Sequence, residues 1–167
     1  MKNILYTLAL FVSISSFGQT AKEYIDIGRT AKENGDYYVA INNYTKALQT
    51  KPSSSEYEIA IWGRGHSKVQ LGDFSGALKD LSELPDDEWD WICYYKGLCK
   101  FNLEDYYGAV SNYSNAIKLN SEFDIAFKNR GDSKEQIGDL VGACNDWKKA
   151  IKLGYQDASK LVTEKCN

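Results

Sequence analysis

The chain has 167 residues, of which 43% are hydrophobic and 26% are charged, which is the balance of a globular domain with a real core. Its formal net charge of -3 argues against a nucleic-acid partner, because nucleic-acid-binding proteins carry a basic patch or stripe. Only two prolines occur, and both fall between segments with helical patterns, so the composition favours an all-helical protein.

Residues 1–18 have the layout of a secretory signal peptide. Lys2 supplies a positive charge, residues 4–12 are almost entirely apolar, and Ser16 and Gly18 place small residues before a cleavage point. The alternative is an uncleaved membrane anchor, but the apolar run is shorter than the roughly 20 residues of a spanning helix. We therefore expect residues 19–167 to be exported, either periplasmic or secreted, with no stable membrane insertion after cleavage.

An interval of 12 residues between a glycine and an alanine recurs four times after the signal sequence. The pairs are Gly28 and Ala40, Gly65 and Ala77, Gly97 and Ala109, and Gly131 and Ala143. A small residue on each of two antiparallel helices lets their backbones approach closely, while larger residues pack around the contact. The interval therefore predicts four helix–turn–helix repeats.

The turn inside each repeat has a signature of its own. In three repeats a glycine, which can end a helix in the left-handed conformation, precedes an aspartate, which can cap the next helix: Gly35-Asp36, Gly72-Asp73 and Gly138-Asp139. The third repeat has Glu104-Asp105, which keeps the aspartate and replaces the glycine.

This pattern resembles the tetratricopeptide repeat, a helix–turn–helix unit of about 34 residues. The resemblance implies an all-α fold, an α-solenoid of four such repeats at about residues 21–54, 58–88, 90–123 and 124–157. A capping helix at about residues 157–166 would follow, with Leu161 and Val162 facing inward to cover the last repeat.

Repeat two departs from this regularity. Pro85 and the acidic run 86–88 come where its second helix would otherwise continue. We predict that this helix ends near Glu83, a turn earlier than its counterparts, and that the superhelix changes its local geometry between repeats two and three.

Four cysteines in an exported chain raise the question of disulfides. Cys93 and Cys99 lie on one predicted helix about 9 Å apart along its axis, which is too far for a bond, so we interpret both as buried thiols. Cys144 lies early in the second helix of repeat four, and Cys166 lies late in the capping helix. An antiparallel arrangement would bring these two together, either as a disulfide or as two independent thiols.

The sequence carries no sign of an enzyme, a cofactor or a metal site. His66 is the single histidine, and no cysteine or carboxylate is clustered with it as a second ligand. Glycine-rich phosphate-binding loops, nucleophile-elbow serine motifs and HExxH motifs are not found, and the acidic run 86–88 lacks the spacing of a calcium loop. We therefore expect a non-enzymatic protein without cofactors.

The resemblance also implies a concave groove lined by the first helix of each repeat. At the groove positions of the family, this chain has charge at both ends and apolar or aromatic residues in the middle. The candidate peptide-binding residues are Trp62, His66, Val69, Trp91, Tyr94, Leu98, Phe101 and Lys128. They either contact a partner or pack within the stack.

Three functions fit these residues. The first is an exported protein–protein interaction module or scaffold that binds a polypeptide segment in the groove. The second is a glycan-binding accessory protein that uses the groove aromatics, and self-association into a homo-oligomer through the same patch is a third. Ile25 and Arg29 replace the lysine and asparagine of family members that grip a C-terminal carboxylate, so that subtype is not supported.

Overall fold

The computed structural model describes residues 19–85 and 88–166, and all regular structure in these ranges is helical. The expected signal peptide and part of the acidic run 86–88 lie outside the described residues. The helices are α1 (Ala21–Glu33), α2 (Tyr37–Gln49), α3 (Ser54–Gln70), α4 (Phe74–Leu81), α5 (Asp90–Asn102), α6 (Tyr106–Leu119), α7 (Asp124–Gln136), α8 (Leu140–Leu153), the short 3-10 helix η1 (Gln156–Ala158) and α9 (Ser159–Lys165).

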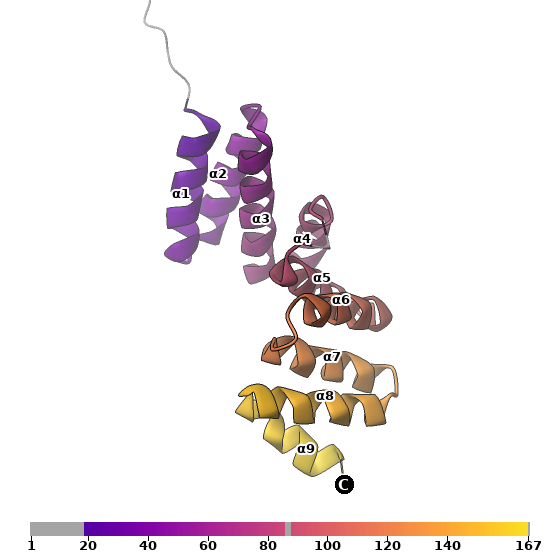
Figure 1. Ribbon diagram of the computed structural model, residues 1–167. Helices are drawn as coiled ribbons and strands as arrows, with labels where there is room; N and C mark the ends of the chain where they lie inside the picture. The colour runs from indigo at the N-terminus through magenta and orange to yellow at the C-terminus, as the bar shows by residue number, and fades with distance from the viewer. Residues whose placement is uncertain (1–18, 86–87, 167) are drawn as a thin grey trace, which may run out of the picture.

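Each odd-numbered helix from α1 to α7 forms a hairpin with the helix that follows it, and each hairpin packs on the next (Figure 1). Figure 1 shows α1, α2 and α3 running side by side, whereas α5 to α8 lie crosswise to them. The change of direction occurs at α4, between the second and third hairpins. None of the described helices has the length and apolarity that crossing a bilayer requires.

The glycines of the recurring interval lie against large buried side chains of the paired helix. A β-carbon added to Gly131, for example, would come within 2.6 Å of the Trp147 indole. Gly28, Gly65 and Gly97 face Tyr44, Leu81 and Tyr113 in the same way. The close approach predicted from the interval is therefore the contact that builds each hairpin, and the core clusters lie along these contacts.

The turns inside the hairpins follow the predicted chemistry with two differences. The three turn glycines have φ between 77° and 83°, and in the third repeat Glu104 takes the same left-handed conformation, with φ 63°. Aspartate side chains cap α4, α6 and α8 by accepting a hydrogen bond from a backbone N–H in the first turn. Asp36 precedes α2 but makes no such bond.

Helix α4 ends earlier than its counterparts, as predicted, and its last residue lies two positions before the expected one. It has eight residues and ends at Leu81 rather than near Glu83, whereas α2, α6 and α8 have 13 or 14 residues. Since the end of a second helix lies beside the start of the first helix in an antiparallel hairpin, the N-terminal half of α3 loses the cover that a full-length α4 would give it. The candidate site lies beside this uncovered part of α3.

Repeats two and four share buried ion networks that the sequence interpretation missed. The carboxylate of Asp80 accepts hydrogen bonds from Arg64 Nε at 2.8 Å and from Arg64 Nη2 at 2.7 Å, and Lys68 Nζ lies 2.8 Å from it. Asp146 is held in the same way by Arg130 and Lys134. Both aspartates are buried, so these networks lock each first helix to its second.

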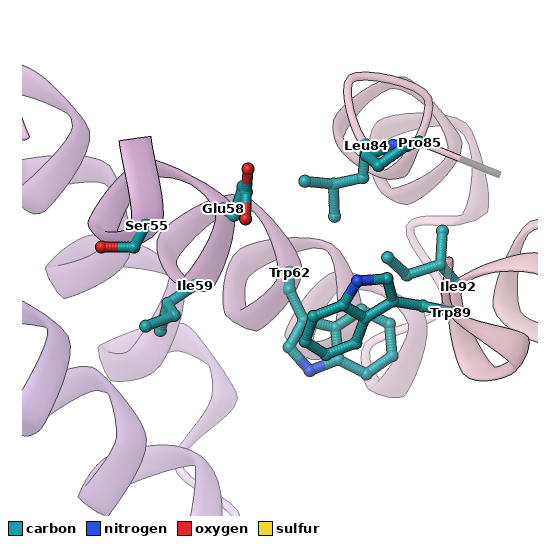
Figure 2. A pocket seen from close by; sticks show the side chains of 8 residues that line it. All are labelled: Ser55, Glu58, Ile59, Trp62, Leu84, Pro85, Trp89 and Ile92. Carbon is teal, nitrogen blue, oxygen red and sulfur yellow. The ribbon is translucent and has the colours of Figure 1, made fainter. Parts of the chain in front are cut away.

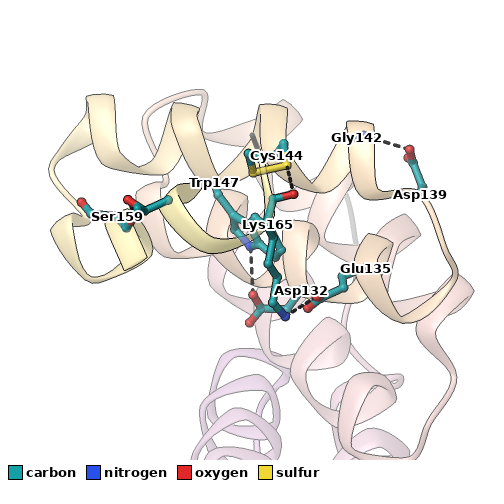
Figure 3. The surroundings of a disulfide bond; sticks show 10 residues. Asp132, Glu135, Asp139, Gly142, Cys144, Trp147, Ser159 and Lys165 are labelled. Carbon is teal, nitrogen blue, oxygen red and sulfur yellow. Dashed lines mark hydrogen bonds and ion pairs between the residues drawn. A yellow bond between two sulfur atoms is a disulfide. The ribbon is translucent and has the colours of Figure 1, made fainter. Parts of the chain in front are cut away.

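The C-terminal cap covers the last hairpin close to the expected bounds, as the 3-10 turn η1 followed directly by α9. Ala158 of η1 is buried, and Leu161 and Val162 of α9 are partly buried against the cluster around Trp147. A disulfide joins Cys144 to Cys166, with Cα atoms 5.6 Å apart (Figure 3). Lys165 also forms an ion pair with Glu135 across the end of the stack.

Cys93 and Cys99 are buried on α5, as the sequence predicted. Burial raises the pKa of the Cys99 thiol to about 12, so the protonated form prevails at neutral pH. A protonated, buried thiol is a poor nucleophile, so Cys99 is part of the packing.

Candidate functional site

An apolar pocket of about 290 Å³ opens where α3 meets the start of α5, beside the end of α4 (Figure 2). Helix α3 supplies one side, the two residues after the α4 turn supply the second, and the start of α5 closes the third. The lining residues are Ser55, Glu58, Ile59, Trp62, Leu84, Pro85, Trp89 and Ile92.

The early end of α4 explains why this space is open. After Leu81 the chain makes one more turn, in which the Leu84 N–H donates to the Leu81 carbonyl at 3.1 Å, and Pro85 then prevents the helix from continuing. Leu84 and Ile92 are buried and form fixed walls. Ile59 and Trp89 stay 42% and 55% exposed, so the pocket is open to solvent on their side.

The rim of the pocket is acidic. Glu58 is exposed on α3, and Figure 2 shows it across the opening from Leu84 and Pro85. Within the described part of the chain, no hydrogen bond or ion pair engages its carboxylate. Glu83, next to the Leu84 wall, accepts a hydrogen bond from the Tyr57 hydroxyl, and this bond raises the pKa of Tyr57.

Trp62 connects the pocket to an aromatic cluster between α3, α5 and α7. Its ring lies 5.4 Å from that of Tyr95, edge to face, and the Tyr95 ring is 5.0 Å from His66 and 6.0 Å from Trp91. Trp91 in turn lies 4.6 Å from Phe123 at the start of α7. Edge-to-face contacts of this kind stabilise aromatic packing beyond the area that they bury.

This packing alters the predicted groove. Val69 and Tyr94 are buried in the core rather than facing a partner, and the Tyr94 hydroxyl accepts a hydrogen bond from Asn129 Nδ2 at 3.1 Å. Trp62, His66, Leu98, Phe101 and Lys128 are partly buried. Trp91, at 47% exposure, presents the largest open face of the eight candidates. Much of the expected aromatic patch is therefore packed within the stack, the alternative that the sequence left open.

His66 serves the packing of the cluster. Its Nε2 lies 3.0 Å from the Tyr95 hydroxyl, and its buried Nδ1 has no hydrogen-bond partner among the described residues. Burial, together with the charge of Lys32, lowers the pKa of His66 to about 4. The ring is therefore neutral at neutral pH. In the described ranges, no three His, Cys, Asp or Glu side chains gather to hold a metal ion.

Lys128 lies at the other end of the predicted groove, away from the pocket. Its Nζ is 2.6 Å from the Asp132 carboxylate. That carboxylate also accepts a hydrogen bond from Trp147 Nε1 at 3.0 Å (Figure 3). The lysine is thus tied to the packing beneath the C-terminal cap.

Sequence reasoning predicted the early helix end at Pro85 but did not find the other residues that shape the site, chiefly Trp89, Leu84, Ile92 and Tyr95. A signal was present, because the interval between the glycines of repeats two and three is shorter than about 34 residues and contains a proline and two tryptophans. The short interval predicts that the second helix of repeat two lacks a turn. The missing turn leaves a space beside the apolar residues of α3 and α5.

This chain resembles known proteins in sequence and in fold. No family model matches the chain. Two curated proteins of Oryza sativa subsp. japonica, DnaJ protein P58IPK homologs B and A, are each 28% identical over 148 residues. The match covers 78% of this chain and 31% and 30% of theirs, so the chain spans about a third of their length.

Solved structures resemble it over most of its length. A structure of MamA has a TM-score of 0.76 at 22% identity, covering 85% of this chain and 78% of that one. YrrB, described as a TPR protein with an unusual peptide-binding site, has a TM-score of 0.72 at 21% identity, covering 80% and 69%. The all-α helical-repeat fold of the tetratricopeptide kind, predicted from the sequence, is therefore confirmed.

Proposed function

We propose that this protein is an interaction module that binds a polypeptide segment across α3 and α5, with the apolar pocket as its anchoring point. The observation that carries the proposal is the preformed pocket, which the half-exposed Trp89 lines, together with the half-exposed Trp91 two residues further along the chain. Aromatic anchors around a desolvated pocket with a polar rim are typical of interface hot spots.

The fold supports this class of ligand. Proteins with this repeat architecture present extended surfaces to other chains, because neighbouring hairpins stack into a curved array. A peptide-binding site is described for YrrB, which shares the fold. The exposed apolar residues Ile59, Trp89 and Trp91 suit contact with another chain.

A glycan ligand fits the same surface less well. Sugars stack on aromatic faces but also need several converging polar groups, and among the eight pocket-lining residues only Ser55 and Glu58 have polar side chains apart from the two indoles. A polypeptide needs fewer side-chain hydrogen bonds, because its own side chains can fill an apolar pocket.

Export is part of the proposal. The signal-like layout of residues 1–18 supports it, and so does the Cys144–Cys166 disulfide, because disulfides persist mainly in oxidising compartments. N-terminal sequencing of the protein purified from its native envelope or medium should give Gln19 as the first residue. Recovery of the chain with Met1 intact in the cytosolic fraction would reject this part of the proposal.

The binding function can be tested without a known partner. We would pan a phage-displayed random dodecapeptide library on the purified full-length protein and measure the affinity of enriched peptides by fluorescence anisotropy. Trp91→Ala should weaken binding roughly tenfold or more, as loss of a hot-spot aromatic does. The matched control is Tyr107→Ala, which removes an exposed aromatic of α6 outside the site. Failure to enrich any binding peptide would refute the proposed function.

A further inference from the structure

We infer that the pocket between α3, Leu84 and α5 accepts a large apolar side chain of the partner whose neighbour in sequence is lysine or arginine. The inference rests on the proposed function and specifies its ligand: a polypeptide segment with an apolar–basic pair. Three features of the pocket carry it, namely its size, its rigidity and the charge of its rim.

The size fits a side chain rather than a whole small molecule. Pockets that enclose a complete small-molecule ligand have volumes of roughly 300–1,000 Å³. At about 290 Å³, this pocket lies at the lower limit and is open on one side. Its walls are carbon atoms of Ile59, Trp62, Leu84 and Ile92, which match an aliphatic or aromatic side chain and offer few partners to a polar one.

The pocket is held open by the protein itself. The buried Lys96 Nζ donates to the Leu84 carbonyl at 3.0 Å, which fixes the wall that follows α4. Trp62 is held from behind by Tyr95, and Ile92 belongs to the same core cluster as Leu84. A ligand therefore does not have to order these walls, and a preformed site loses less affinity to ordering than a flexible one.

The charge of the rim selects the neighbour of the anchoring side chain. Glu58 lines the pocket with an unengaged carboxylate, and Glu83 adds a second carboxylate beside the Leu84 wall. The nearby cations do not neutralise this charge, because both have other partners. Arg64 forms an ion pair with Asp80, and the Lys96 ammonium donates to the Leu84 carbonyl. A lysine or arginine next to the partner's anchoring side chain would lie over Glu58 and form an ion pair with its carboxylate.

The dodecapeptides selected on the full-length protein test this assignment. We expect enriched sequences to place a large apolar residue directly beside Lys or Arg more often than the unselected library does. Glu58→Gln should weaken these peptides about twofold to fivefold, the range of an exposed ion pair, and high salt should remove the difference. Ile59→Asn should weaken them roughly tenfold or more, because it places an amide in the apolar wall. Tyr107→Ala should leave affinity unchanged.

The contrary outcomes separate this inference from the proposed function. Peptides that lose affinity in Trp91→Ala but keep it in Ile59→Asn and Glu58→Gln would overturn the pocket assignment and leave the binding function intact. The absence of any binding peptide would overturn both. A concentration-dependent dimer in sedimentation velocity that Ile59→Asn abolishes would also overturn the inference, because the occupant would then be a second copy of the chain.

Discussion

The C-terminal cap gives a quantitative prediction, because helix α9 contributes no fully buried residue and depends on its covalent bond. We consider the double substitution Cys144→Ser and Cys166→Ser, which removes the disulfide and keeps side chains of similar size. The bond spans a sequence separation of 22 residues. For a loop of that length, the entropy of the unfolded chain predicts a contribution of about 3 kcal/mol to the free energy of unfolding.

The assay is differential scanning calorimetry combined with hydrogen exchange of the α9 amides. For a chain of this size, a loss of about 3 kcal/mol should lower Tm by roughly 6–12 °C if the cap unfolds with the whole. Amides of Ser159–Lys165 should exchange faster in the variant, because α9 then depends on the partly buried Leu161 and Val162 and on one ion pair.

Two controls accompany this measurement. Wild-type protein with excess dithiothreitol should reproduce the shift, and thiol counting on unfolded, non-reduced protein should give two free thiols rather than four. A Tm within about 2 °C of wild type, with equal protection of the α9 amides, would refute the reasoning that the disulfide holds the cap.

Three further predictions concern the hairpins. The pKa of His66 is about 4 in the folded protein and near 6.5 in the unfolded chain, so its neutral form stabilises the fold fully above pH 6.5, and this stability is lost as pH falls toward 4. Carboxylates titrate in both proteins, so between pH 7 and pH 4 wild type should lose more stability in urea unfolding than His66→Gln, by up to roughly 3 kcal/mol at 1.36 kcal/mol per pKa unit. Equal losses would contradict this. Asp80→Asn should destabilise by roughly 3–5 kcal/mol, because it leaves the partly buried Arg64 and Lys68 without their buried carboxylate. Glu164→Gln, in an exposed pair, should change stability by under about 1 kcal/mol, and equal urea midpoints for the two variants would contradict this. Gly63→Ala should lower stability by roughly 1–3 kcal/mol although alanine has the better helix propensity, because the new β-carbon would lie 2.3 Å from the Tyr44 ring. A variant that melts above wild type would show that the contact is not tight.

The repeat architecture could be predicted because its determinants are short-range. The interval from Gly131 to Ala143, with Trp147 four residues further on, encodes a contact within one hairpin, and the same spacing appears four times. The ion networks of repeats two and four could also have been predicted from the sequence. Arg64, Lys68 and Asp80 have the same spacing as their counterparts in repeat four, but a search based on small residues alone passes over them.

The candidate site could be predicted only in part, because it depends on how hairpins cross. Tyr94 and Tyr95 are neighbours on α5, about 100° apart around the helix, and both could face the groove. The position of α7 decides that Tyr94 is buried, and the position of α3 decides that Tyr95 contacts Trp62. The groove positions of the family predicted that Tyr94 faces the groove, because those positions assume that all repeats stack in the same way. The short helix α4 interrupts that regular stacking between repeats two and three.

The central claim is that the pocket beside α4 holds the partner's anchoring side chain. Titration of ¹⁵N-labelled protein with an enriched peptide tests it most directly, because the four indole N–H resonances can be assigned by single Trp→Phe substitutions. We predict that the signals of Trp62 and Trp89 shift and saturate with the affinity measured by anisotropy, while that of Trp147 stays in place. Saturable binding with no change at Trp62 and Trp89 would contradict the account.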